Sequence, residues 1–208
     1  SMEKDILMGI KDESKRSLNL GLFYQRTNEP EKAIKQFENL VQPYLDNDDW
    51  IENNQELSDY ASSAVGNLFV LYIITGNYES VEDLIDIVRA VNLDGCDGAY
   101  YQAKLSMSRG EYEDALVYIN ECLEKRPVFS FGYNLRSNIY LTLGNKTEAI
   151  NDARKSASLN PLNGSIATSH ANVLYQRVSE LGDDVTAELI RETKDALMRA
   201  IRLNPRNW

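Results

Sequence analysis

The sequence has few of the residues from which metal centres, disulfide frameworks and basic interfaces are built. It contains two cysteines and one histidine among 208 residues, too few for a disulfide framework and little for a zinc site. Lysine and arginine number 22 against 32 acidic residues, a net charge of −10, which disfavours nucleic acid and anionic membranes as partners. No apolar run approaches the length of about 18 residues that a membrane-spanning helix needs.

The remaining composition is that of an ordinary globular protein, with 43% apolar and 26% charged residues. The length suits one domain or two small ones. No charged segment followed by an apolar one opens the chain, so we expect no signal peptide in it. Ser1 resembles the remnant of a cleaved tag. Because the chain stops at Trp208 directly after a helical pattern, we interpret it as a piece of a longer protein.

Several residue types recur at one spacing along the chain. The spacing is 34 residues for Gly76, Gly110 and Gly144, for Pro127 and Pro161, for Ala115 and Ala149, and for Asn138 and Asn172. Leu159-Asn160-Pro161 returns 44 residues later as Leu203-Asn204-Pro205, which we interpret as one period plus an insertion of ten. Agreement between independent residue types indicates a structural repeat.

Each repeat has the pattern of two helices. A glycine ends the first helix, since it adopts the left-handed conformation that stops one. An amphipathic stretch follows. In residues 113–123, apolar residues at positions 115, 116, 119, 122 and 123 have the spacing of a helix with one buried face. A proline such as Pro127 then prevents the helix from continuing.

This pattern resembles the tetratricopeptide repeat (TPR) family, which expects particular residue types at fixed positions of a two-helix unit. The residues at these positions, unit by unit, are Leu20, Gly21, Tyr24, Ala33 and Phe37; Tyr72, Gly76, Tyr78, Val81, Ile85 and Val88; Ala103, Gly110, Tyr112, Ala115, Ile119, Cys122 and Pro127; Tyr133, Tyr140, Gly144, Ala149, Ala153 and Pro161; and Ala167, Ala171, Leu197, Ala200 and Pro205. Phe69 and Val81 depart from the pattern, since they stand where small residues are expected, and we expect that helix pair to be spread apart.

The resemblance implies an all-α fold, a right-handed superhelical stack of antiparallel helix pairs. We expect a lead-in over residues 1–13 and one TPR domain over 14–208. Its five units would span about 14–45, 62–95, 96–129, 130–163 and 164–208, with an insertion at 46–61. The acidic segment from Asp46 to Asp59 is predicted to be a solvated loop, because it lacks the glycine and glutamate of an EF-hand.

The resemblance also places a binding groove on the first helix of each pair, which we term the A helix. Asn138 and Asn172 occupy the same groove position in adjacent units, and an amide side chain can both donate to and accept from a peptide backbone. Aromatic residues could supply apolar anchors. The residues predicted to bind a peptide are Asn138, Asn172, Asn134, Tyr100, Lys104, Phe131, Tyr175 and Val70. The alternative for the asparagines is that they bond to neighbouring helices or water.

The groove of one TPR subfamily grips a C-terminal carboxylate, which requires cations because an anion is costly to desolvate. In the first three units of this sequence the corresponding positions hold Leu18, Leu22, Asn67, Asp97 and Tyr101. Only Asn67 matches, and this function is rejected.

The remaining candidate residues favour structural roles. Cys96 and Cys122 are predicted to be free and buried, without a disulfide or a metal. His170 is predicted to be a packing or capping residue. The cations Arg191, Lys194, Arg199, Arg202 and Arg206 favour a helix C-terminus, or would pair with a further unit if the chain continues.

We therefore predict a non-enzymatic scaffold in the cytoplasm that binds a protein or peptide partner, with no cofactor, no metal, no nucleic acid and no membrane. Three alternatives remain: a recruitment domain of a larger enzyme such as a TPR-bearing glycosyltransferase, a bacterial secretion-type chaperone, and a homodimerisation module. The last alternative would use the apolar residues Val70, Ile73 and Ile74.

Overall fold

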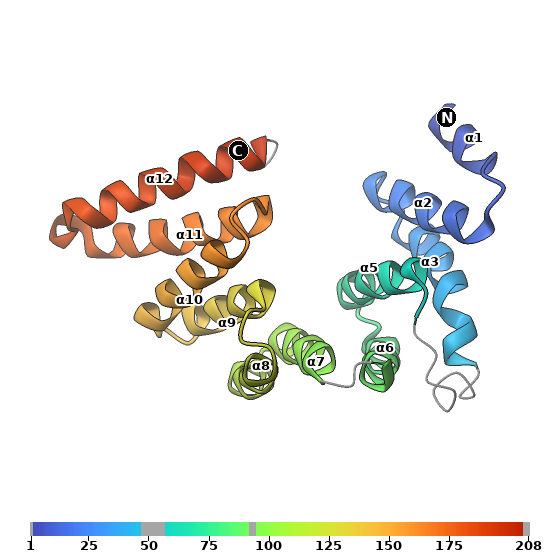
Figure 1. The fold of residues 1–208 in the computed structure, drawn as a ribbon, viewed down its shortest axis with the longest axis horizontal. Coiled ribbons are helices and arrows are strands. Elements are labelled where there is room, and N and C mark those ends of the chain that lie inside the picture. Colours follow the sequence, from blue (N-terminus) through green and yellow to red (C-terminus); the bar gives the residue numbers. More distant parts are fainter. Residues whose placement is uncertain (1, 47–56, 92–94, 206–208) are drawn as a thin grey trace. The chain divides into compact units, whose positions relative to one another are not determined.

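The computed structural model describes residues 2–46, 57–91 and 95–205. These residues form α-helices joined by short turns, and no strand occurs among them. The helices divide between two compact units, Ser1–Leu93 and Asp94–Trp208 (Figure 1). The predicted all-α fold is confirmed.

The described residues of the first unit form a short leading helix and two helix pairs. Its helices are α1 (Met2–Met8), α2 (Glu13–Arg26), α3 (Pro30–Leu45), α5 (Asp59–Thr75) and α6 (Tyr78–Val91). Between α2 and α3, Gly21 lies against the fully buried ring of Phe37, where an added Cβ would come within 2.5–2.8 Å of ring atoms. Phe69 and Val81 are both buried in the second pair. Most of the acidic segment, residues 47–56, lies outside the described residues.

The second unit contains three helix pairs in succession. They are formed by α7 (Cys96–Arg109), α8 (Tyr112–Lys125), α9 (Ser130–Thr142), α10 (Lys146–Leu159), α11 (Gly164–Leu181) and α12 (Ala187–Leu203), with a 3₁₀ turn at Gly182–Asp184. Helices α11 and α12 lie side by side over most of their length (Figure 1). The A helices of this unit are α7, α9 and α11.

Glycine stops the A helices where the 34-residue spacing predicts. Gly76, Gly110 and Gly144 have φ angles of 74°, 79° and 80°, the left-handed region that other residues rarely adopt. After Gly110 the chain reverses within two residues, and α8 begins at Tyr112. The spacing of the glycines therefore sets where each pair turns back on itself.

The interior of the second unit is apolar, and hydrogen bonds pair several of its polar groups. Arg136 Nε and Nη2 donate to the two carboxylate oxygens of Asp152 at 2.7 and 3.0 Å, and its Nη1 donates to Asn120 at 2.8 Å. The hydroxyl of Ser137, fully buried, donates to the carbonyl of Ala149 at 2.7 Å. These bonds join α8, α9 and α10. They also satisfy polar groups whose burial would be costly if they were left unpaired.

The cysteines correct one prediction. Cys96 and Cys122 form a disulfide between α7 and α8, so the expectation that both are free is wrong. Both residues are fully buried, as expected. The error arose because each cysteine was considered separately as a small core residue. Their positions, the first of one helix and near the end of the next, face each other across an antiparallel pair.

Candidate functional site

A hollow of about 370 Å³ opens on the A helices α9 and α11. It is lined by Asn134, Asn138, Leu141, Ser165, Thr168, Ser169, Asn172, Val173 and Gln176. The residues of each helix recur every three or four positions, a spacing that places them along one face. Three of the eight predicted site residues, Asn134, Asn138 and Asn172, therefore lie together.

The amide groups in this hollow are only partly engaged. Asn138 Oδ1 accepts a long bond of 3.4 Å from the hydroxyl of Ser169. No hydrogen bond from the side chains of Asn134, Asn172 or Gln176 is found among the described residues. Four amide side chains thus line one hollow whose apolar part comes from Leu141 and the buried Val173. Such a surface can pair with the donors and acceptors of an extended backbone.

Ser169 and Val173 also line the hollow and are not among the eight residues predicted to bind a peptide. They belong to the face of α11 that turns toward α9, and Val173 is buried against Ala149 and Ala153 of α10. The helical spacing of α11 places both residues on the face of the hollow, since Ser169 lies one turn from Asn172 and Val173 lies one turn from Gln176.

Tyr100, Lys104 and Phe131 gather on an aromatic cluster rather than in the hollow. The rings of Tyr100 and Phe129 lie 5.2 Å apart edge to face, and Phe129 lies 6.1 Å from Phe131. The ammonium of Lys104 lies 5.6 Å from the ring centre of Tyr100. Burial raises the pKa of Tyr100 to about 12 and lowers the pKa of Lys104. Tyr100 is thus mainly a packing residue, whereas Phe131 is 40% exposed.

The two remaining predicted residues are exposed. Tyr175 on α11 has 57% of its surface exposed, and Val70 on α5 has 39%. Val70 belongs to the first unit and the other seven to the second. In the first unit, Ile74 is also exposed, at 71%.

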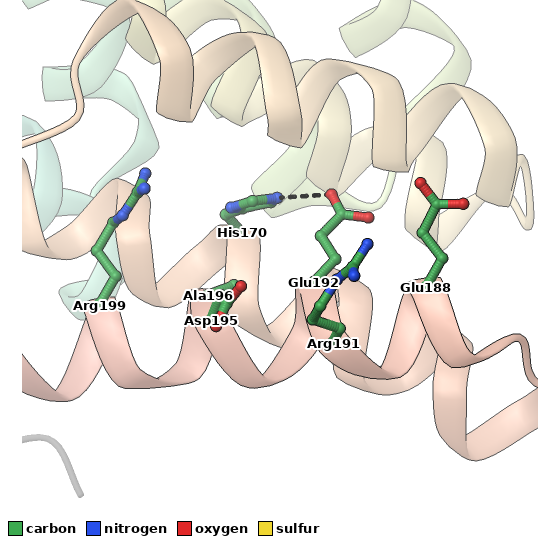
Figure 2. Close-up of a pocket in the computed structure, with 7 residues that line it drawn as sticks. All are labelled: His170, Glu188, Arg191, Glu192, Asp195, Ala196 and Arg199. Carbon is green, nitrogen blue, oxygen red and sulfur yellow. Dashed lines mark ion pairs between the residues drawn. The ribbon is translucent and has the colours of Figure 1, made fainter.

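A second hollow, of about 270 Å³, lies beside His170 (Figure 2). His170 comes from α11, and the other lining residues come from α12: Glu188, Arg191, Glu192, Asp195, Ala196 and Arg199. His170 Nε2 lies 4.0 Å from Glu192 Oε1 and has no hydrogen-bond partner among the described residues. Burial lowers the pKa of His170, which favours the neutral ring at neutral pH.

The carboxylate that faces His170 already has a partner. Arg154 of α10 donates to both oxygens of Glu192, at 2.7 and 2.6 Å, and this lowers the pKa of Glu192. Glu192 is therefore held as an anion and ties α12 to α10. This arrangement fits the packing role predicted for His170.

The described ranges contain neither a metal-binding cluster nor a membrane span. Within residues 2–46, 57–91 and 95–205, no group of three His, Cys, Asp or Glu side chains could hold a metal ion. In the same ranges no helix is long and apolar enough to cross a membrane.

Residues 132–161 match the family model of the tetratricopeptide repeat. The fold is similar to that of a thermophilic TPR protein in Thermus thermophilus, with 15% identity and a TM-score of 0.62 over 93% of this chain and 92% of that one. It is also similar to PilF of Pseudomonas aeruginosa (15% identity, TM-score 0.57, 91% of this chain and 77% of that one). For MamA of Desulfovibrio magneticus RS-1, from residue 41 to its end, the identity is 13% and the TM-score 0.50, over 95% of this chain and 98% of that one.

No curated protein matches the chain. The family match and the structural similarities identify the class of protein: an α-solenoid with the TPR fold. That fold supports protein-interaction scaffolds in general, and it places the hollow on the A helices.

Proposed function

We propose that the chain is a non-enzymatic scaffold that binds a protein or peptide segment along its A helices. The observation that carries this proposal is the convergence of Asn134, Asn138 and Asn172 on one open hollow, where their amides are largely unengaged. Asn134 and Asn138 are half-buried, and half-buried amides usually have partners, so amides left available here favour an external partner.

The binding would combine backbone and side-chain recognition. An amide side chain can pair with the N–H and the C=O of the same peptide unit, and Asn138 and Asn172 stand one repeat apart. Phe131 and Tyr175 are the exposed aromatic residues that would anchor apolar side chains of the segment. Ordering a flexible segment on docking costs free energy and moderates the affinity.

The proposed partner is a protein, not a nucleic acid or a membrane, because the net charge of −10 opposes polyanions. Free cysteines would favour the predicted cytoplasmic location, since disulfides are rare there. Since Cys96 and Cys122 form a disulfide, that argument no longer holds. The location stays a prediction, which cell fractionation tests.

The groove is tested by capture of partners with two matched variants. Asn138→Ala with Asn172→Ala removes two of the four amides of the hollow, whereas Asn145→Ala with Asn151→Ala removes two exposed amides at α10. We expect the wild type and the control to retain a partner that the groove variant loses. Calorimetry with that purified partner then measures the loss, expected to be about tenfold or more.

Stability distinguishes a binding role from a structural one. We expect the groove variant to unfold within about 0.5 kcal/mol of the wild type, since its side chains make few bonds. Retention of the partner by the groove variant would contradict the proposal. A drop in stability equal to the drop in binding would assign the asparagines to the fold.

A further inference from the structure

Helix α12 exposes an apolar stripe on the side that does not pack on α11. Ile190, Met198 and Ile201 are 48%, 52% and 46% exposed. Their spacing of eight and three residues keeps them on one face of the helix. The opposite face packs on α11 through the buried Ala196 and Ala200. We term Ile190, Lys194, Met198 and Ile201 the terminal face.

Helix α12 is structurally equivalent to α10 with a shift of 44 residues. Both helices end in Leu-Asn-Pro, and the two capping residues share one conformation: φ −139° and ψ 72° at Asn160, φ −143° and ψ 66° at Asn204. The cap amides bond to Ser156 and Ala200, which are themselves 44 residues apart. This shift maps the terminal face onto Lys146, Ile150, Arg154 and Ala157 of α10.

The equivalent face of α10 contacts the next helix pair. Lys146 pairs with Glu180 of α11 at 2.7 Å, and Arg154 pairs with Glu192 of α12 at 2.6 Å. Ile150 packs against the cluster formed by α11 and α12, and Ala157 is 5% exposed. In α10 this face is therefore an interface with helices, and two carboxylates of the covering helices neutralise its cations.

Helix α11 follows the same rule. Leu141 of α9 packs against the cluster that contains Val173, and the residue 34 positions later is Tyr175, which is 57% exposed. Among the described residues, Ile201 and Tyr175 are thus exposed at positions where the preceding pair has the buried Ala157 and the packed Leu141.

Charge indicates what would cover the terminal face. Lys194 and Arg202 are exposed on or beside it, and no ion pair of these two side chains is found among the described residues. A second copy docked through the same face would bring two sets of these cations together, which opposes symmetrical pairing. Carboxylates on the covering helix would satisfy them, as Glu180 and Glu192 satisfy the cations of α10.

We propose that the terminal face of α12 docks an amphipathic helix of a partner protein, with a small apolar stripe flanked by acidic residues. The contact would repeat the one that α11 and α12 make on α10. It is separate from the asparagine hollow, so the chain would have two binding surfaces: one for an extended segment and one for a helix.

The test uses a synthetic helix of about 18 residues, long enough for about five turns. Its stripe is leucine and alanine at helical spacing, its flanks are glutamate, and it carries a fluorophore for anisotropy titration against the whole chain. Two matched peptides have lysine flanks or a scrambled order. We expect the glutamate peptide to bind at least about tenfold more tightly than either matched peptide. Added salt should weaken the binding of the glutamate peptide.

Variants of the chain locate the contact. Met198→Glu and Ile201→Glu each place an anion in the stripe and should weaken binding about tenfold. Val117→Glu changes an apolar residue of α8 that is 64% exposed, and should leave binding unchanged. The Asn138→Ala, Asn172→Ala variant should also bind normally, so failure of this proposal and failure of the groove proposal are distinguishable. Circular dichroism checks that each variant keeps its helices.

Four results would overturn the inference. Equal binding of the scrambled peptide would mean that the face does not select the apolar stripe. Equal binding of the lysine peptide would mean that it does not select the charge. Unchanged binding to Met198→Glu and Ile201→Glu would place the contact elsewhere. A wild-type dimer in sedimentation that Met198→Glu converts to a monomer would assign the face to a second copy of the chain.

Discussion

Two neighbouring helix pairs join the same two positions by different bonds. In the pair α7/α8, Cys96 and Cys122 form a disulfide. The residues 34 positions later in the pair α9/α10 are Ser130 and Ser156, and the hydroxyl of Ser156 donates to the carbonyl of Ser130 at 2.8 Å. The backbone of the pair brings the two positions together, and the side chains determine whether the link is covalent.

The last pair, α11/α12, has neither link. Its equivalent residues are Gly164 and the fully buried Ala200, which carry no polar side-chain atom. Instead α12 approaches the start of α11 so closely that a Cβ on Gly164 would lie 3.0 Å from the carbonyl oxygen of Leu203. The same antiparallel contact is thus made by a covalent bond in one pair, a hydrogen bond in the next and close packing in the last. We expect the contribution to stability to decrease in that order.

Removal of the disulfide should have the largest effect. The bond spans 26 residues of sequence, and in the chain-entropy account closing such a loop contributes about 3 kcal/mol to the free energy of unfolding. Cys96→Ala with Cys122→Ala should lower stability by this amount, measured by urea unfolding with hydrogen exchange reporting on α7 and α8. Addition of a reducing agent should destabilise the wild type and leave the stability of the variant unchanged. Insensitivity of the wild type to reduction would contradict the prediction.

Transfer of the disulfide to the next pair should have the second largest effect. Because Ser130 and Ser156 are equivalent to the two cysteines, Ser130→Cys with Ser156→Cys should form a bond on oxidation. We expect a gain of about 2 kcal/mol, less than the native bond provides, since engineered disulfides often strain their surroundings. Peptide mapping by mass spectrometry identifies the bond, and the single variant Ser156→Cys is the control. Failure to oxidise would show that the two pairs differ in backbone geometry.

Loss of the hydrogen bond in α9/α10 should cost less. Ser156→Ala removes the 2.8 Å bond to Ser130 and should lower stability by about 1 kcal/mol. Thermal unfolding measures the change. Ser158→Ala, which removes an exposed hydroxyl bonded within its own helix, is the matched control. Equal effects of the two changes would mean that the buried link contributes nothing specific.

The smallest effect is expected at the close packing of α11/α12. Gly164→Ala places a methyl group near the backbone of Leu203, while alanine favours the helix. The two effects oppose each other, and we expect a net loss below about 1 kcal/mol. Gly144→Ala tests a different cause, since Gly144 has open space but a φ of 80°. A larger loss at Gly144 than at Gly164 would identify backbone conformation as the stronger constraint.

The helical repeat could be predicted because its signals are local. Gly110 and Gly144 end helices by conformation alone, and the spacing of Ala115, Ile119 and Cys122 gives the buried face without knowledge of neighbours. The disulfide could not be found that way, since it depends on two residues meeting across a pair. The rule that positions 1 and 27 of a unit face each other, as Ser130 and Ser156 do, would have found it.

The candidate site was predictable to a similar degree. Asn138 and Asn172 repeat at 34 residues, and the structure places both in one hollow with Asn134. Tyr100 was proposed as an anchor, yet it packs against Phe129, because an aromatic residue on a groove position can also fill the space beneath it. Whether these residues bind a peptide stays a prediction.

The disulfide also changes how far the chain can be drawn out under force. Residues between Cys96 and Cys122 are bypassed by the covalent link, so a pull on the two ends does not lengthen them. At about 3.5 Å per extended residue, the disulfide excludes the 26-residue span, about 90 Å of contour length, from the extended chain. A stretched molecule would therefore gain that length only after reduction, which makes its extension a direct readout of the state of the two sulfurs.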